Sequence, residues 1–296
     1  MVSGESMRFE EFARSHGLII NGVETGKWVA TPTEDHPRSR NGRYKYMGDH
    51  GWVQNWATMT SPVIWKGQSA SLTPSQIRQA KFHADKERRE AASKAASKAG
   101  WILHQTRQAF HPYLKGKGFP DEQGHVWVTD DGLLLVIPMR VDGRLVGCQL
   151  IDDKGEKKFL SGQVTKGAVF TMDAKGIPVF VEGYATALSV RAAMKAMKIR
   201  YTIHVCFSAS NLEFVAGKVL GGLIIADNDS NGVGERAAQK TGKPYWMPPT
   251  VGHDANDYHA TAGLFQVSQS LKRSLISNGL ITAAQSSPPS ASPARV

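Results

Sequence analysis

The stretch FVEGYATALSVRAAMKAMKIRYTIHVCFSASNLEFVAGKVLGGLIIADND, residues 180–229, decides the fold of this chain. Short, continuously apolar runs at 178–182, 202–208 and 221–227 alternate with helical stretches, the first of them at 184–197. Such runs are typical of strands buried on both faces, and their alternation with helices predicts a parallel sheet flanked by helices. This part of the chain therefore belongs to the α/β class.

Carboxylates stand at the ends of these runs. Glu182 ends the first run, Asp227 and Asp229 end the third, and the loop GHDANDY adds Asp254 and Asp257. Functional groups collect where the carboxyl ends of parallel strands meet. Acids gathered there repel one another unless a cation lies between them, and oxygen ligands favour Mg²⁺ or Mn²⁺. A lone acid after a strand more often caps the next helix, but this set favours a metal site suited to displacement at phosphorus.

Length, charge and cysteine content limit the classes of protein to which this chain can belong. The 296 residues suit one large domain or two to three small ones, and a hydrophobic fraction of 41% is enough for an ordinary core. A formal charge of +10 favours a polyanionic partner, usually nucleic acid, although charge spread thinly for solubility would also fit. We expect neither a membrane span nor a signal peptide. Cys148 and Cys206, each in an apolar segment, indicate buried thiols in a reduced, cytoplasmic protein.

Residues 1–65 predict a small β-rich module. A short helix over 8–17 would stop at Gly17, and residues 26–56 combine Pro and Gly punctuation with alternating aromatics. Basic and aromatic side chains in this module could grip single-stranded DNA, although a solvated basic hairpin fits nearly as well. These candidates for DNA contact are Arg38, Arg40, Arg43, Tyr44, Lys45 and Tyr46.

The remaining segments are predicted from pattern and punctuation. Residues 66–112 read as a charged helical linker, with a second helical stretch at roughly 101–117. Residues 113–175 predict an antiparallel meander of about four strands with good hairpin turns. Residues 266–296 predict a C-terminal helix and a low-complexity tail that we expect to be disordered.

Capping patterns predict where two of the helices begin. Ser210, with Glu213 three residues later, would open the second helix of the parallel region. Thr73, Pro74 and Gln76 form the same pattern at the start of the linker helix. That helix is polar all round, which favours a solvated bridge between domains over a surface for a phosphate backbone.

Three motifs resemble the Toprim domain, which bacterial-type DNA primases, type IA and II topoisomerases and some nucleases share. They are VFVEGYATALSV at 179–190, LIIADND at 223–229 and HDANDY at 253–258. The resemblance covers about residues 176–265 and implies a Toprim-type parallel sheet.

The resemblance also implies roles for the acids. Glu182 would serve in acid/base or metal chemistry, and Asp227 and Asp229 would bind Mg²⁺. Asp257, with Asp254 as its rival, would be a further metal-side acid.

Upstream motifs indicate which kind of Toprim protein the chain resembles. YLKGKGF at 113–119, IPMRVDGRLVGCQLID at 137–152 and KKFLSGQVTKG at 157–167 resemble the small α+β subdomain that precedes Toprim in primases, most closely in plasmid- and phage-encoded ones. By resemblance this basic subdomain holds the template and the incoming nucleotides. Lysines could instead guard an edge strand, and an arginine could pair with a nearby carboxylate. The candidates are Arg140, Lys157, Lys158, Lys166 and, for base stacking, Phe159.

Two features depart from that family. Replicative primases often have an Asp four residues after the Glu, where this chain has Thr186. They also begin with a cysteine zinc ribbon, which this module lacks. The module resembles a degenerate ribbon in which packing of Trp28, Trp52 and Trp56 replaces the metal. No zinc is expected, because the spacing of the candidate ligands fits no standard set. Those candidates are His16, Asp35, His36 and His50.

The sequence therefore predicts a DNA primase of a plasmid, phage or other mobile element that makes RNA primers on single-stranded DNA from NTPs. The alternatives are a Toprim nuclease and a non-catalytic single-strand-binding accessory protein. A topoisomerase would need a nucleophilic tyrosine on a separate large domain. The sequence has no G-x-x-x-x-G-K-[ST] motif, so a helicase would be a separate partner.

Overall fold

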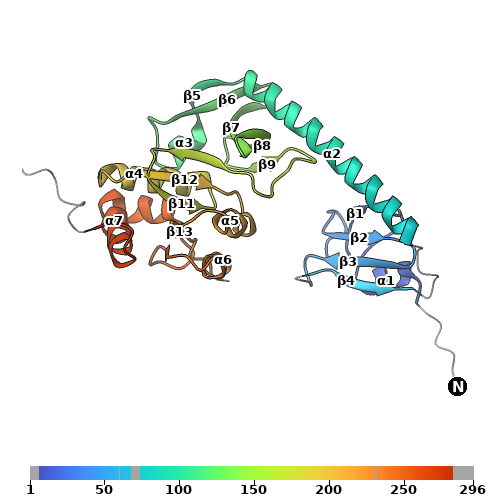
Figure 1. The fold of residues 1–296 in the computed structure, drawn as a ribbon. Coiled ribbons are helices and arrows are strands. Elements are labelled where there is room, and N and C mark those ends of the chain that lie inside the picture. The colour runs from blue at the N-terminus through green and yellow to red at the C-terminus, as the bar shows by residue number, and fades with distance from the viewer. Residues whose placement is uncertain (1–6, 60, 68–73, 231, 283–296) are drawn as a thin grey trace, which may run out of the picture. The chain divides into compact units, whose positions relative to one another are not determined.

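The structure is a computed structural model that describes residues 7–59, 61–67, 74–230 and 232–282 (Figure 1). The chain divides into two compact units, Met1–Arg89 and Glu90–Val296. Helix α2 (Pro74–His104) contributes residues to both units. In the described parts of the chain, no helix combines the length and apolar character that crossing a membrane requires.

The first unit has one short helix and one antiparallel sheet. Helix α1 (Phe9–Ser15) confirms the helix expected at 8–17. The sheet has the order β1-β2-β3-β4, so consecutive strands are neighbours. Its strands are β1 (Trp28–Thr31), β2 (Gly42–Tyr46), β3 (His50–Asn55) and β4 (Val63–Lys66).

The core of this unit lies between α1 and one face of the sheet. Phe9 of α1 contacts Tyr44, Tyr46 and Trp65, with ring centroids 5.8, 4.8 and 5.5 Å away. Val53 completes this cluster and is fully buried. Because side chains alternate along a strand, Tyr44 and Tyr46 share the face that α1 covers.

The prediction that Trp28, Trp52 and Trp56 form this core is wrong. Trp28 and Trp56 are 41% and 46% exposed. Trp28 and Trp52 both pair with Lys45, so all three residues lie on the face of the sheet opposite Tyr44. The core is built by α1 instead, whose Phe9 the tryptophan pattern did not take into account.

The second unit begins with a five-stranded antiparallel sheet in the order β5-β6-β7-β8-β9. One face packs on α2 through Ala95, Ala99 and Ile102, and the other joins the main core of the unit. The strands are β5 (Arg107–Phe110), β6 (Gln123–Thr129), β7 (Gly132–Val141), β8 (Arg144–Ile151) and β9 (Lys157–Phe159).

The helical stretch expected at 101–117 is wrong. Helix α2 ends at His104, and residues 107–110 form the edge strand β5. The chain then turns into the short helix α3 (Pro112–Gly116), where the His111 ring accepts the Tyr113 N–H at 3.2 Å. Proline at the first helical position cannot continue a preceding helix, which separates α3 from what comes before. The capping residue Thr73 lies outside the described residues.

A second sheet carries the predicted parallel pairing. Its order is β10-β12-β11-β13-β14, in which only the edge strand β10 runs antiparallel to its neighbour. The mixed α/β class is therefore as expected. The strands are β10 (Phe170–Asp173), β11 (Ile177–Val181), β12 (Tyr201–Val205), β13 (Leu223–Ile225) and β14 (Tyr245–Trp246).

Four helices cover this sheet, two on each face. Helices α4 (Tyr184–Ala196) and α7 (Ala255–Ser277) pack with Val179, Val181 and Ile203, whereas α5 (Ala209–Ala216) and α6 (Val233–Lys240) pack with Phe180 and Ile224. A kink at Gly263, with φ of 83° and ψ of 159°, divides α7 into two helical segments, and the second of them continues past residue 265. The low-complexity tail SSPPSASPARV at 286–296, predicted to be disordered, lies outside the described residues.

Two local predictions in this unit have different outcomes. Cys148 and Cys206 are free and buried, as expected, and burial raises the pKa of both thiols. The cap of α5 is Ser208 rather than Ser210: the Ser208 hydroxyl accepts the Asn211 N–H at 3.3 Å. Asn211 is buried and donates to the Cys206 carbonyl oxygen, which fixes the first turn of the helix earlier than the capping pattern predicted.

Candidate active site

The predicted acids lie at the carboxyl edge of the parallel sheet. Val181 of β11 pairs with Ile225 of β13, so Glu182 and the segment that leads to Asp227 leave the sheet side by side. Asp229 follows two residues later and is exposed. The sequence placed these acids correctly because strand direction and strand end are both local properties of the chain.

Asp227 is the most perturbed of these acids. Its pKa is raised from 3.8 to about 7, mainly because burial disfavours the charged form. The neighbouring carboxylates of Asp254, Glu182 and Asp229 raise it further, and the ammonium of Lys157 lowers it. Burial also raises the pKa of Glu182, again with Asp229 adding to the effect and Lys157 opposing it. These groups therefore share one electrostatic site.

The loop before α7 brings Asp254, rather than Asp257, towards Asp227. Asp254 is the N-cap of α7 and accepts the N–H groups of Asn256 and Asp257 at 2.7 and 2.9 Å. Asp257 closes the capping box by accepting the Asp254 N–H at 3.2 Å. Thr186, which is fully enclosed, donates its hydroxyl to Asp254 at 3.3 Å. A hydroxyl at this position adds a hydrogen bond where a further carboxylate would add repulsion.

Polar atoms around the acids are buried without a hydrogen-bond partner. Within the described residues these include Asp227 Oδ1, the Tyr113 hydroxyl and His253 Nδ1. Burial, followed by the charge of Asp254, raises the pKa of Tyr113 to about 12. A buried polar atom without a partner costs about 1–3 kcal/mol, so these three atoms add to the energetic cost of the site.

The acids do not form a ready-made metal cage. In the parts of the chain that the structure describes, no three His, Cys, Asp or Glu side chains are grouped closely enough to enclose a metal ion. An ion that takes one or two carboxylates and keeps water or phosphate as its other ligands needs no such cage. The four residues weighed as zinc ligands in the first unit make separate contacts, among them His16 with the Phe12 carbonyl oxygen and His50 with Asp49.

Strand β9 separates the two adjacent lysines. Lys157 pairs with Ile151, on the face that joins the main core, and its charge lowers the pKa of both Glu182 and Asp227. Lys158 pairs with Leu150, on the face that packs against α2. The structure therefore brings Lys157 to the acids and directs Lys158 away from them.

A pocket of about 370 Å³ is lined by Tyr113, Lys117, Asp153, Lys154 and Lys157, and two of these residues interact electrostatically with the acids: Lys157 with Glu182 and Asp227, and Tyr113 with Asp254. Lys117 is held in place because its carbonyl oxygen accepts the Asn256 side-chain amide at 2.9 Å. Three lysines outnumber the one carboxylate of this pocket, Asp153, so its lining suits a polyphosphate that also carries a cation. The sequence analysis predicts no role for Lys154 or for Lys117, although Lys117 lies in the motif YLKGKGF, which could have indicated it.

The other basic candidates of this unit lie elsewhere. The guanidinium of Arg140 donates to the Gly143 carbonyl oxygen at 3.1 Å, at the β7–β8 turn. The ammonium of Lys166 lies over the ring of Phe214, 4.6 Å from its centroid. Phe159 is 44% exposed and meets the ring of Phe207, which follows β12, at 6.2 Å.

In the first unit, the open face of the sheet differs from the predicted DNA contact. Tyr44 is only 3% exposed and Tyr46 packs on Phe9, so both tyrosines belong to the core. Arg43 lies on the open face with its guanidinium 4.4 Å from the Trp28 ring and 5.7 Å from the Trp56 ring. The same face holds Lys45, and the turn before β2 holds the exposed side chains of Arg38 and Arg40.

No family model matches the chain. Among solved structures it is similar to a chain of a bacteriophage T7 assembly, in which the lagging-strand DNA polymerase interacts with primase domains of two gp4 subunits bound to an RNA/DNA hybrid and dTTP. The TM-score is 0.40 and the identity 15%, over 57% of this chain and 91% of that one.

Two further similar structures are primase fragments. The primase fragment of the bacteriophage T7 primase-helicase protein gives a TM-score of 0.38 at 15% identity, over 55% of this chain and 69% of that one. The RNA polymerase domain of Mycobacterium tuberculosis primase DnaG gives 0.34 at 16% identity, over 56% and 63%. At these TM-scores, the function has to be derived from the geometry of the site itself.

Proposed function

We propose that this protein is a DNA primase with a Toprim-type catalytic sheet. It would join NTPs into a short RNA primer on single-stranded DNA, in the cytoplasm, during replication of a plasmid, phage or other mobile element. The observation that carries the proposal is the buried, unpartnered Oδ1 of Asp227 among other acids, with Lys157 of the lysine-lined pocket close enough to lower the pKa of Asp227. A separate helicase would be a further partner.

Mg²⁺ or Mn²⁺ suits the oxygen donors of this site. Asp227 and Asp229 would hold the ion, and Asp254 lies nearer to Asp227 electrostatically than Asp257 does. The unpartnered Oδ1 of Asp227 supports this fit, because a cation would satisfy it. When bound, the ion would lower the pKa of the attacking hydroxyl and neutralise the departing pyrophosphate.

The side chains around the acids would divide the remaining work. Lys117, Lys154 and Lys157 would bind the triphosphate, and Lys157 would also draw it towards the carboxylates. Glu182 has a raised pKa, so it is a better proton acceptor than an exposed glutamate and would take the proton of the primer 3′-hydroxyl. Positioning and charge neutralisation would supply most of the rate enhancement, as in other phosphoryl transfers.

The test is primer synthesis on circular single-stranded DNA with Mg²⁺ and labelled NTPs. Asp227→Asn should reduce RNA synthesis at least roughly 100-fold, because it removes a charge essential to transition-state stabilisation. Asp142→Asn is the matched control: Asp142 is exposed in the β7–β8 turn with φ of 47°, a conformation that Asn also adopts. It should leave synthesis unchanged.

Other outcomes distinguish the alternatives. Nicked DNA without RNA products would overturn priming and indicate a Toprim nuclease. DNA affinity that survives Asp227→Asn, with neither RNA synthesis nor cleavage by the unsubstituted protein, would indicate a single-strand-binding accessory protein.

A further inference from the structure

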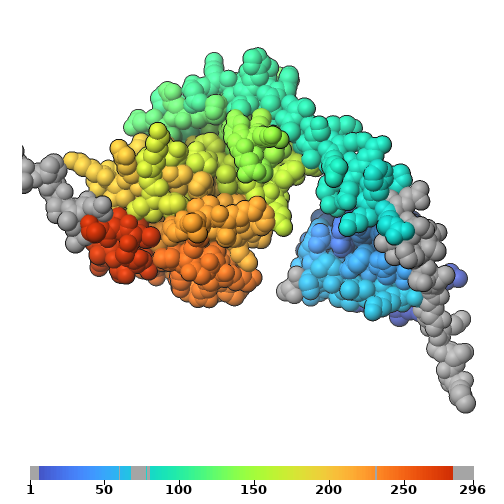
Figure 2. Space-filling model, viewed as in Figure 1, coloured from blue at the N-terminus to red at the C-terminus, as the bar shows by residue number. Residues whose placement is uncertain are grey.

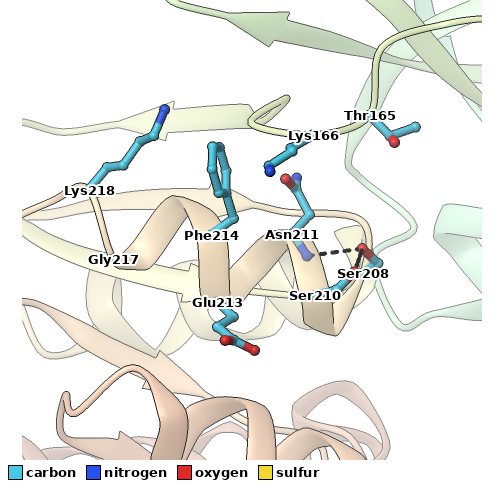
Figure 3. A pocket seen from close by; sticks show the side chains of 9 residues that line it. All are labelled: Thr165, Lys166, Ser208, Ser210, Asn211, Glu213, Phe214, Gly217 and Lys218. Carbon is cyan, nitrogen blue, oxygen red and sulfur yellow. Dashed lines mark hydrogen bonds between the residues drawn. The ribbon is translucent and has the colours of Figure 1, made fainter. Parts of the chain in front are cut away.

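A second pocket runs along α5, from its N-cap Ser208 to Lys218 beyond its end (Figure 3). Its cavity volume is about 670 Å³, larger than that of the lysine-lined pocket. The resemblance implies that Lys166 contacts the template or the triphosphate, but it assigns no role to the other residues of this pocket. It is lined chiefly by Thr165, Lys166, Ser208, Ser210, Phe214 and Lys218.

Two lysines in this pocket share one aromatic ring. The ammonium of Lys166 lies 4.6 Å from the centroid of the Phe214 ring and that of Lys218 lies 4.3 Å from it. Figure 3 shows the two side chains on opposite sides of the ring. Attraction to the ring offsets part of the cost of holding two like charges close together. Phe214 thus positions two cations that come from separate segments of the chain.

The loop that carries Lys166 is fixed from below by α5. Asn211, a buried residue of this helix, accepts the Gly167 N–H at 2.6 Å and donates to the Ala168 carbonyl oxygen at 2.8 Å. Gly167 has φ of 78° and lies against Phe214, where a Cβ atom would approach the ring to 3.2 Å. The position of Lys166 therefore follows from three fixed contacts rather than from a free surface side chain.

The charge of the two lysines is not neutralised within the pocket. Glu213, the one acid among the lining residues, pairs with Lys240 at 3.7 Å, and Figure 3 shows it directed away from both lysines. Among the described residues, neither Lys166 nor Lys218 has an ion-pair partner within 4 Å. The hydroxyl groups of Ser208 and Ser210, which form a hydrogen bond with each other, line the pocket at the start of α5, whereas Lys218 lies beyond the end of this helix (Figure 3).

The pocket is joined to the acids by the segment that caps α5. Phe207 precedes Ser208, and its N–H donates to the Glu182 carbonyl oxygen at 2.9 Å. The Phe207 ring also meets Phe159 of β9 at 6.2 Å. A chain of phosphates that passed the acids could therefore continue past the two phenylalanines into this pocket.

We propose that this pocket binds backbone phosphates of single-stranded DNA, remote from the reacting bond. Lys166 and Lys218 each neutralise one phosphate, and the serine hydroxyls add hydrogen bonds. Both faces of Phe214 are occupied by ammonium groups, so the ring is not free to stack on a base. The contact is therefore independent of sequence. Only the role of the strand as a primase template rests on the proposed function.

The experiment measures affinity of the full chain for labelled oligo-dT over a series of salt concentrations, with EDTA to exclude divalent ions. Losing one phosphate contact should reduce the magnitude of the slope of log K against log salt by about 0.7 for a single strand, which corresponds to roughly fivefold at about 0.1 M salt. We expect this loss for Lys218→Ala and for Lys166→Ala. Lys195→Ala, which removes an exposed lysine of α4, is the control and should leave the slope unchanged.

A second variant tests the role of the ring. Phe214→Leu keeps both lysines but removes the cation–π attraction, so affinity should fall roughly two- to fivefold while the salt slope stays the same. Phe214→Tyr should restore the affinity, because it retains the ring. Thermal unfolding of each variant shows whether the protein remains folded.

Several results would overturn the proposal. One is an affinity and slope for Lys218→Ala equal to those of Lys195→Ala. Another is loss of binding to a labelled free nucleotide with oligo-dT binding intact, which would assign the pocket to nucleotides. Primer synthesis by the unsubstituted protein separates the two hypotheses. If RNA products form but Lys218→Ala binds oligo-dT normally, only the proposed role of the pocket is contradicted. If Lys218→Ala weakens oligo-dT binding but no RNA products form, only the proposed primase activity is contradicted.

Discussion

Asp227 is the side chain of the site whose charged form is destabilised most. Its carboxyl group is buried, has an unpartnered oxygen and faces three other carboxylates, and Lys157 offsets only part of this. A cation bound there would remove most of the penalty. Without a bound cation, the folded protein destabilises the charged form of the Asp227 carboxyl group.

This cost predicts how stability depends on pH. The pKa of Asp227 is raised from 3.8 to about 7, so between these values the folded state binds a proton that the unfolded state has released. The free energy of unfolding of the metal-free protein should therefore fall as pH rises from about 4 to 7, by at most about 4 kcal/mol from this residue. Asp227→Asn should raise the melting temperature in EDTA at pH 8 and have little effect near pH 4.

Calorimetry at the two pH values provides the measurement, with Asp142→Asn as the control. A melting temperature of Asp227→Asn equal to that of the unsubstituted protein at pH 8 would show that Asp227 carries no such cost. Mg²⁺ should stabilise the unsubstituted protein more than Asp227→Asn.

Thr186 supports Asp254 through a hydrogen bond from its hydroxyl group. Its hydroxyl donates to Asp254 inside the core, where an acid would face another carboxylate. Thr186→Asp should lower the free energy of unfolding at pH 8 by about 3 kcal/mol or more, because an uncompensated buried charge is strongly destabilising. Thr186→Val, which removes only the hydrogen bond, should cost about 1 kcal/mol. Equal losses for the two variants would contradict repulsion as the cause.

At the scale of elements, α6 packs tightly against the end of β13. A Cβ atom at Gly234 would lie 2.5 Å from the Asp227 carbonyl oxygen and 3.0 Å from its nitrogen, so any side chain there must displace the backbone of the central acid. Glycine at this position allows the helix to approach the strand end closely.

Gly234→Ala should therefore reduce primer synthesis by roughly tenfold or more, since small displacements of reacting groups have large effects on rate. Alanine favours helices, so any loss is steric rather than conformational. Gly100→Ala in α2 is the control: its Cβ atom would meet nothing nearer than 3.9 Å, so it should keep activity and stabilise the helix by up to about 1 kcal/mol. Full activity in Gly234→Ala would show that the close contact between α6 and the backbone of Asp227 does not matter for catalysis.

The sheet of the first unit presents its own testable surface. Arg43 donates to Gln54 at 3.0 and 2.8 Å and lies near the exposed rings of Trp28 and Trp56, an arrangement suited to stacking on unpaired bases. Trp28→Ala should lower affinity for single-stranded DNA about fivefold or more, as expected from about 1–3 kcal/mol per stacked base. Ile19→Ala, another exposed apolar residue of this unit, should not. Unchanged affinity of Trp28→Ala would leave this face without a role in DNA binding.

At the scale of the whole molecule, each unit has its own hydrophobic core. Phe9, Tyr44 and Val53 belong to the first, and Leu188 belongs to the second. Separate cores predict two unfolding transitions in calorimetry. Val53→Ala should lower the free energy of unfolding of the first unit by about 2 kcal/mol and shift only its transition. Leu188→Ala should lower the free energy of unfolding of the second unit by about 2–5 kcal/mol and shift only the other transition. A single transition shifted by both variants would contradict independent units.

Local patterns predicted much of the second unit and less of the first. The position of Glu182, Asp227 and Asp229 after strand ends was predictable because a buried strand and its end can be recognised from neighbouring residues. Helix and strand were confused at 101–117, where residues 107–110 between α2 and α3 pair with the next strand, β6, rather than continuing a helix. The tryptophans of the first unit were assigned to the core because aromatic content does not indicate which face a helix covers.

The sequence by itself determined the parallel strand–helix pattern and the acids at the strand ends, since both depend on residues close together in the chain. Only the tertiary structure decided which of these groups interact. It turned Lys157 towards the acids and Lys158 away, selected Asp254 over Asp257 as the neighbour of Asp227, and brought Lys166 and Lys218 to one ring. Burial and charge–charge interactions act through space, so they are set by packing between segments distant in the sequence.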